Sequence, residues 1–258
     1  MSSMYAFHGA DGKTGTTMIT QSIAEIIASS RKELKILVVS MHGRPGTDYV
    51  DRVCESIEGI RLHLENRLLD TQRLMEGCRI RDNLYMLGGV ESIEQVRGYH
   101  PHMAAYLLES MKDAFDLILT DTGNDIDNGL AVGALEYIGN NYCILAQQET
   151  IISRYEKVKP LYDRLGICFS SYIVNKYTDQ DPYDLHYIGK RLCLDQEKLM
   201  KVAVSGYERQ AESDHRTLLS YKSEEFSNDI QLIANHVLTR AQIPTIDHVR
   251  KKKWMPFI

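Results

Sequence analysis

Residues 8–17 read HGADGKTGTT and stand between a short apolar run and a segment with helical periodicity. The run Met4–His8 has the composition of a buried strand, and Ile19, Ile23 and Ile27 recur at helical spacing after the loop. Glycines in such a turn let successive backbone N–H groups point inward, and the start of the next helix adds partial positive charge. The stretch therefore predicts a phosphate-binding loop.

Two registers of the P-loop pattern GxxxxGK[ST] compete for this stretch. The first ends the motif at Gly12-Lys13-Thr14, which keeps the lysine but puts Phe7 at the first glycine position. The second ends it at Gly15-Thr16-Thr17, which keeps the usual loop length and loses the lysine. We prefer the second register, and the first remains the alternative.

Short apolar runs alternate with helical patterns through the rest of the chain. The further strand-like runs are Lys35–Ser40, Leu84–Leu87, Leu117–Thr120, Tyr142–Ala146 and Ser171–Val174. Near-continuous apolar strands separated by helices indicate a mostly parallel sheet that is covered on both faces. We predict a doubly wound α/β fold with about seven strands and a single domain over residues 1–258. Residues 1–210 would form its core, followed by C-terminal helices and a tail.

Two further stretches of the sequence predict helices. Ile57, Ile60, Leu64 and Leu68 recur at the spacing of one helix face. Residues 195–242 read as helices throughout.

Composition limits the classes of function. A net charge of -5 and a pI near 6.0 argue against binding of nucleic acid by the overall surface. No apolar run has the length of a membrane span. The five cysteines are scattered without a CxxC or CxC pair, and Cys143, Cys168 and Cys193 lie among apolar residues that we expect to be buried. We expect a cytoplasmic protein without a thiolate metal site.

The loop resembles the deviant Walker A motif KGGVGKTT of the ParA/MinD superfamily of P-loop proteins. It is more similar to the TadZ/CpaE branch, in which the usual lysine is absent. Residues 36–42 resemble the family's switch I strand, residues 115–123 its Walker B strand, residues 144–149 the segment VvtqPe, and residues 173–176 the strand end lVlNR/K. Residues 83–89 resemble the segment nlyvLpg of the TadZ/CpaE branch.

The resemblance implies that ATP or ADP binds with Mg²⁺. The nucleotide would be held by Asp11, Gly12, Lys13, Thr14, Gly15, Thr16 and Thr17, with Asn175 at the adenine edge. Mg²⁺ would contact the Thr17 hydroxyl and Asp121, whose carboxylate ends an apolar strand and is costly there without a cation or solvent. Ser40 and His42 stand where the family has switch I aspartates. We expect both to be surface residues of a loop and assign them no catalytic role.

The resemblance also implies a homodimer with nucleotide between its two copies, acting in positioning or assembly of a Tad-type pilus or secretion machine. Its place would be the cell pole or the inner membrane face. We expect very weak or no ATPase activity and assign no catalytic residue, because Thr16 and Asp11 replace the two lysines of the family motif. Lys13 is the local cation that would substitute, and Asp11 would repel the phosphates.

The sequence leaves three alternative functions. An active partition-type ATPase that moves DNA or protein cargo would need those lysines and a basic face. A scaffold without nucleotide and a metal-cofactor insertase are the others, and the insertase lacks its cysteine pair. The basic and apolar tail Lys251–Ile258 would touch an anionic membrane or a partner, or fold back on the domain.

Overall fold

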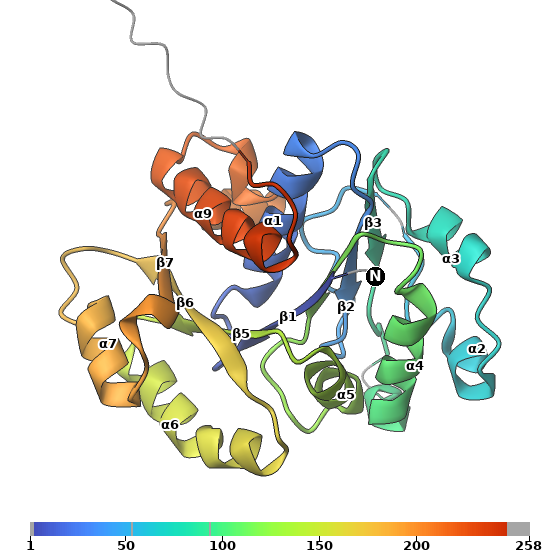
Figure 1. The fold of residues 1–258 in the computed structure, drawn as a ribbon, viewed down its shortest axis with the longest axis horizontal. Helices are drawn as coiled ribbons and strands as arrows, with labels where there is room; N and C mark the ends of the chain where they lie inside the picture. Colours follow the sequence, from blue (N-terminus) through green and yellow to red (C-terminus); the bar gives the residue numbers. More distant parts are fainter. Residues whose placement is uncertain (1–2, 53, 93, 247–258) are drawn as a thin grey trace, which may run out of the picture.

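A computed structural model of the chain describes residues 3–52, 54–92 and 94–246. These residues build a seven-stranded sheet in the order β3-β2-β4-β1-β5-β6-β7, in which each neighbouring pair of strands is parallel (Figure 1). The strands are β1 (Ser3–Gly9), β2 (Ile36–Ser40), β3 (Leu84–Leu87), β4 (Leu117–Asp121), β5 (Asn141–Ala146), β6 (Phe169–Tyr177) and β7 (Leu199–Ala203). The predicted fold class is confirmed.

Helices cover both faces of the sheet. They are α1 (Thr16–Ser30), α2 (Arg61–Asn66), α3 (Thr71–Cys78), α4 (Pro101–Met111), α5 (Gly129–Ile138), α6 (Glu149–Arg164), α7 (Leu185–Leu192), α8 (Glu208–Ser213) and α9 (Glu224–Arg240). Short 3₁₀ helices lie at Val96–Gly98, Gln196–Lys198 and Leu218–Ser220. Helices α1 and α9 lie side by side on one face, and α4, α5, α6 and α7 lie on the other (Figure 1).

Alternation along the strands explains the two layers of core. In β2, Ile36 and Val38 pack with α1 and α9, whereas Leu37 and Val39 pack with the helices of the opposite face. All four side chains are buried, which is why the strand reads as a continuous apolar run.

Strand β7 corrects the expectation that residues 195–242 are helical throughout. Its sequence is Leu-Met-Lys-Val-Ala, in which four of the residues favour helices by intrinsic propensity. The segment nevertheless pairs with β6 at the edge of the sheet, where Met200 and Lys201 are only partly buried. Pairing with β6 therefore overrides local propensity.

The predicted helix face that included Leu68 is also wrong. Helix α2 covers only Arg61–Asn66, and Arg67 adopts a left-handed conformation with φ 55°. The chain leaves the helix there, so Leu68 is 69% exposed. Ile57 and Ile60 are buried but precede the helix.

The cysteine expectation holds only in part. Cys143 is buried within β5, but Cys168 and Cys193 are exposed because they stand in the loops before β6 and after α7. The predicted contact of residues 251–258 lies outside the described part of the chain. Within the described ranges, no helix combines the length and apolarity that a membrane crossing needs.

Candidate functional site

The glycine-rich loop joins the carboxyl end of β1 to the start of α1. Strand β1 ends at Gly9, and α1 begins at Thr16 after Gly15, which caps the helix in a left-handed conformation with φ 90°. The free N–H groups at this helix start attract an anion. Because the helix starts directly after Gly15, the geometry favours the register that ends the motif at Gly15-Thr16-Thr17.

Two side chains from the end of β6 hold the loop through its backbone. Asn175 Nδ2 donates a hydrogen bond to the Thr14 carbonyl at 2.8 Å, and Lys176 Nζ donates to the Lys13 carbonyl at 2.9 Å. Gly15 is packed so closely that a Cβ there would lie 2.4 Å from Asn175 Nδ2. The Asn175 amide therefore fixes the loop, while its role at adenine stays a prediction.

We expect Gly15→Ala to lower the free energy of unfolding by about 2 kcal/mol or more and to weaken nucleotide binding. A left-handed conformation costs an alanine about 1–2 kcal/mol, and the clash with Asn175 adds to it. Urea unfolding measures the first effect and calorimetry the second. Gly12→Ala is the matched control, because a Cβ at Gly12 meets nothing within 4 Å. Equal stability of the two variants would contradict this reading of the loop.

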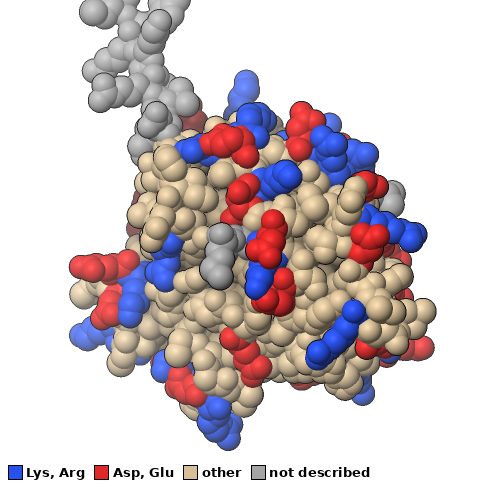
Figure 2. All heavy atoms as spheres, turned by 45° about the vertical axis from the view of Figure 1, so that its right-hand side comes forward, with Lys and Arg blue, Asp and Glu red and all other residues tan. Residues whose placement is uncertain are grey.

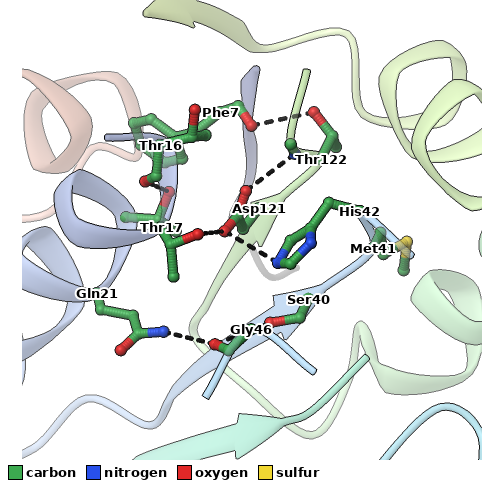
Figure 3. Close-up of polar contacts among 12 residues, drawn as sticks. Phe7, Thr16, Thr17, Gln21, Ser40, Met41, His42, Gly46, Asp121 and Thr122 are labelled. Atoms are coloured by element: carbon green, nitrogen blue, oxygen red, sulfur yellow. Dashed lines mark hydrogen bonds and ion pairs between the residues drawn. The ribbon is translucent and has the colours of Figure 1, made fainter. Parts of the chain in front are cut away.

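The side chains of Thr17 and Asp121 contact each other in the candidate site (Figure 3). Thr17 Oγ1 donates to Asp121 Oδ2 at 2.6 Å, and the backbone N–H of Gly123 donates to Asp121 Oδ1 at 2.9 Å. Asp121 is 1% exposed. A hydroxyl and a carboxylate are oxygen ligands of the kind that Mg²⁺ prefers, so the two predicted metal residues lie together and fit the ion.

His42 is a residue of the site whose contact with Asp121 the sequence did not predict. Its side chain is 9% exposed, and Nε2 lies 3.4 Å from Asp121 Oδ2. Ser40 is fully buried and donates to the Gly46 carbonyl at 3.3 Å. The expectation that Ser40 and His42 are surface residues is therefore wrong. The cause is the register of β2 against β4, which places Ser40 opposite Asp121 at the carboxyl ends of both strands.

Asp11 has a cationic partner that its position in the loop does not reveal. Its Oδ1 lies 3.3 Å from Arg154 Nη1 on α6 and accepts the Gly12 N–H at 2.7 Å. Arg154 also lies 3.9 Å from Asp125. The guanidinium offsets part of the repulsion expected between Asp11 and phosphates, although partly exposed pairs of this kind are weak.

A cleft of about 800 Å³ opens in front of the loop. Of the predicted residues, those that line it are Asp11, Lys13, Thr14, Gly15, Thr16 and Thr17. Gly12, Asp121 and Asn175 are not part of the lining, and Asp121 lies buried behind Thr17 and His42.

The charged lining of the cleft is mainly acidic. Its acidic side chains are Asp11, Asp48, Glu91, Asp125, Asp127 and Glu212, and its basic ones are Lys13, Arg44 and Arg97. Six carboxylates against three cations disfavour a free polyanion. A nucleotide would therefore enter as its complex with a divalent cation.

A buried histidine lies beneath the loop. His8 of β1 contacts Thr122 Oγ1 through Nδ1 at 3.0 Å and Tyr162 Oη through Nε2 at 2.9 Å. Burial lowers the pKa of His8 from 6.5 to about 4, so the imidazole is neutral in the folded protein at neutral pH. The neutral ring joins β1 to the segment after β4 and to α6.

We expect His8 to make the protein less stable in mild acid. Between pH 6.5 and pH 4 the unfolded chain binds a proton at His8 that the folded chain does not, so the stability from this site is lost as the pH falls. The loss approaches about 3 kcal/mol by pH 4. Urea unfolding of wild type and His8→Gln across this range isolates the contribution of His8. If the free energy of unfolding fell equally with pH in the two proteins, His8 would not be the source of the loss.

Comparison with known proteins gives a fold but no sequence relative. No family model matches the chain, and no curated protein matches it. A ParA family ATPase from Chlorobium tepidum TLS superposes with a TM-score of 0.79 at 16% identity, covering 92% of this chain and 100% of that one. MinD from Pyrococcus horikoshii OT3, solved with Mg-ADP, gives 0.71 at 17% identity, covering 94% and 100%. An ATP complex of a Cyanothece McdA variant gives 0.70 at 11% identity, covering 96% and 99%.

These likenesses extend over nearly the whole of each chain, and the candidate site lies at the carboxyl ends of the central strands of the shared sheet. The chain therefore has the α/β fold of the ParA and MinD ATPases.

Proposed function

We propose that this protein binds ATP or ADP with a divalent cation, Mg²⁺ in the first instance, over residues 11–17. The observation that carries the proposal is the contact of Thr17 with Asp121 beside the start of α1. It puts an anion site and a pair of oxygen ligands next to each other. The MinD and McdA structures that share the fold contain Mg-ADP and ATP, respectively.

Binding and the role of the cation are testable by calorimetry. We expect wild type to bind Mg-ATP and Thr17→Val to bind it about tenfold more weakly, because the hydroxyl ligand is lost. In EDTA the two proteins should bind ATP equally weakly. Thr239→Val, on the exposed surface of α9, is the control. Absence of binding by wild type at millimolar Mg-ATP would favour the scaffold without nucleotide.

Hydrolysis should be very slow, because the two lysine positions of the family motif carry no cation. Thr16 is 7% exposed and its hydroxyl lies 3.3 Å from that of Thr14, while Asp11 is a carboxylate. Cations that neutralise the transferring phosphoryl group are worth several orders of magnitude in rate. Steady-state phosphate release tests this expectation. Fast turnover that Lys13→Ala abolishes would restore the register ending at Gly12-Lys13-Thr14.

We further propose a homodimer formed through the nucleotide face, in the cytoplasm, with a role in positioning or assembling a Tad-type pilus or secretion machine. The support is the resemblance of the loop and of residues 83–89 to the TadZ/CpaE branch. Light scattering with and without Mg-ATP at tens of micromolar tests the dimer. A monomer under both conditions would contradict the proposed homodimer.

The alternative, a partition-type ATPase that moves DNA cargo, has less support. Figure 2 shows basic and acidic side chains interspersed over one face of the molecule, without a broad basic patch there. The mainly acidic cleft agrees with this. We therefore do not expect nucleic acid as a partner.

A further inference from the structure

We propose that His42 is a ligand of the divalent cation, so that the site binds Mn²⁺ in preference to Mg²⁺; this rests on the proposed nucleotide binding. The His42 Nε2 atom is buried and has no hydrogen-bond partner among the described residues. Asp121 Oδ2 lies 3.4 Å from this nitrogen, which is longer than an ordinary hydrogen bond, and a metal ion shared with that carboxylate would satisfy the nitrogen of the nine-tenths buried side chain.

The Asp121 carboxylate contacts both Thr17 and His42 (Figure 3). Asp121 Oδ2 lies 2.6 Å from Thr17 Oγ1 and 3.4 Å from His42 Nε2. Neighbouring ligands of an octahedral ion with bonds of about 2.1 Å lie about 3.0 Å apart. The two observed distances fall on either side of that value, so shifts of a few tenths of an ångström would give Asp121 Oδ2 the spacing of a shared coordination shell to Thr17 Oγ1 and to His42 Nε2.

The surrounding loops hold the imidazole in place. A Cβ at Gly123 would lie 2.4 Å from His42 Cβ, and a Cβ at Gly46 would lie 2.6 Å from His42 Nε2. Both glycines have positive φ, 61° and 65°. The Gly46 carbonyl accepts hydrogen bonds from Gln21 Nε2 at 2.7 Å and from Ser40. The segment at Gly46 is thus anchored to α1 and β2. Because Gly46 has no side chain, no Cβ occupies the space beside His42 Nε2.

An imidazole changes which ion the site prefers. Mg²⁺ is a hard ion that binds oxygen at near-ideal octahedral geometry, whereas first-row transition metals bind imidazole more strongly. With one nitrogen among oxygen ligands and phosphate oxygens, Mn²⁺ is the ion nearest to Mg²⁺ that gains from the exchange. The described residues contain no cluster of three histidine, cysteine, aspartate or glutamate side chains suited to a metal. Phosphate oxygens and water would complete the shell, so we expect the ion to bind most tightly together with the nucleotide.

Pulsed electron paramagnetic resonance of bound Mn²⁺-ADP gives a direct readout. We expect nitrogen modulation from a coordinated imidazole in wild type and its loss in His42→Asn. His102→Asn, an exposed histidine at the start of α4, is the matched control and should keep the signal. Circular dichroism checks the fold of each variant, and the wild-type spectrum alone decides should His42→Asn fail to fold.

Calorimetry gives the second readout, as the ratio of the dissociation constants for Mg²⁺-ADP and Mn²⁺-ADP. Wild type should bind the Mn²⁺ complex about tenfold more tightly, and His42→Asp, which offers oxygen instead of nitrogen, should remove most of that preference. Binding of Mg²⁺-ADP and Mn²⁺-ADP by wild type without nitrogen modulation would overturn the role of His42 and leave the proposed function intact. If neither complex binds, both proposals fall.

Discussion

A Thr16→Lys variant is expected to bind Mg-ATP at least about tenfold more tightly than wild type. Thr16 is the first residue of α1 and lines the cleft, so a lysine there would extend from the anion-binding helix start towards the phosphates. A charge-assisted hydrogen bond from an ammonium is worth about 1.5–3 kcal/mol, which is roughly tenfold to a hundredfold in affinity. Loss of the contact between Thr16 and the Thr14 hydroxyl costs little beside this.

Calorimetry measures the gain for Thr16→Lys, and Thr239→Lys on α9 controls for the added charge. Combining Thr16→Lys with Asp11→Lys should raise steady-state phosphate release by orders of magnitude, because both cations of the family motif would then be present. An unchanged affinity in Thr16→Lys would show that the motif does not end at Gly15-Thr16-Thr17.

Asp121→Ala is expected to weaken Mg-ATP binding by about a hundredfold and to make the remaining binding insensitive to EDTA. The variant loses the carboxylate that orients the Thr17 hydroxyl, and it frees the Gly123 N–H. Loss of a metal-coordinating carboxylate and of its hydrogen bonds is worth a few kcal/mol.

The control for Asp121→Ala lies just beyond the opposite end of β4. Asp116 is an exposed carboxylate that accepts the Lys35 N–H just before β4, so Asp116→Ala removes a similar charge far from the loop. Binding of Mg-ATP that is equal in the two variants would contradict a metal role for Asp121.

The sequence was informative where the signal is local. Strands β1, β2 and β4 lie in the centre of a parallel sheet, buried on both faces, and therefore read as apolar runs. The loop between β1 and α1 follows the local order of strand, glycine-rich turn and helix start that predicts a phosphate-binding loop. Strand β7 was missed because it is short, lies at the sheet edge and has helix-favouring residues.

The loop and the nearness of Thr17 to Asp121 were predictable from the sequence, and the remaining contacts of the site were not. The meeting of His42 with Asp121 depends on the pairing of β2 with β4, and the meeting of Asp11 with Arg154 depends on where α6 lies. Neither contact leaves a pattern in the neighbouring sequence. The one usable signal was that residues following adjacent parallel strands meet at one edge of the sheet, which would have drawn His42 towards Asp121.

The hydrogen bonds from β6 to the phosphate-binding loop have a thermodynamic consequence. Lys176 reaches the Lys13 carbonyl from a left-handed conformation with φ 54°, at the point where the pairing of β6 with β7 changes register. Any molecule that binds the edge of the sheet and displaces the Lys176 ammonium also changes the free energy of the loop that receives the nucleotide. Linkage makes that effect reciprocal, so the nucleotide would alter the affinity at the sheet edge by the same factor.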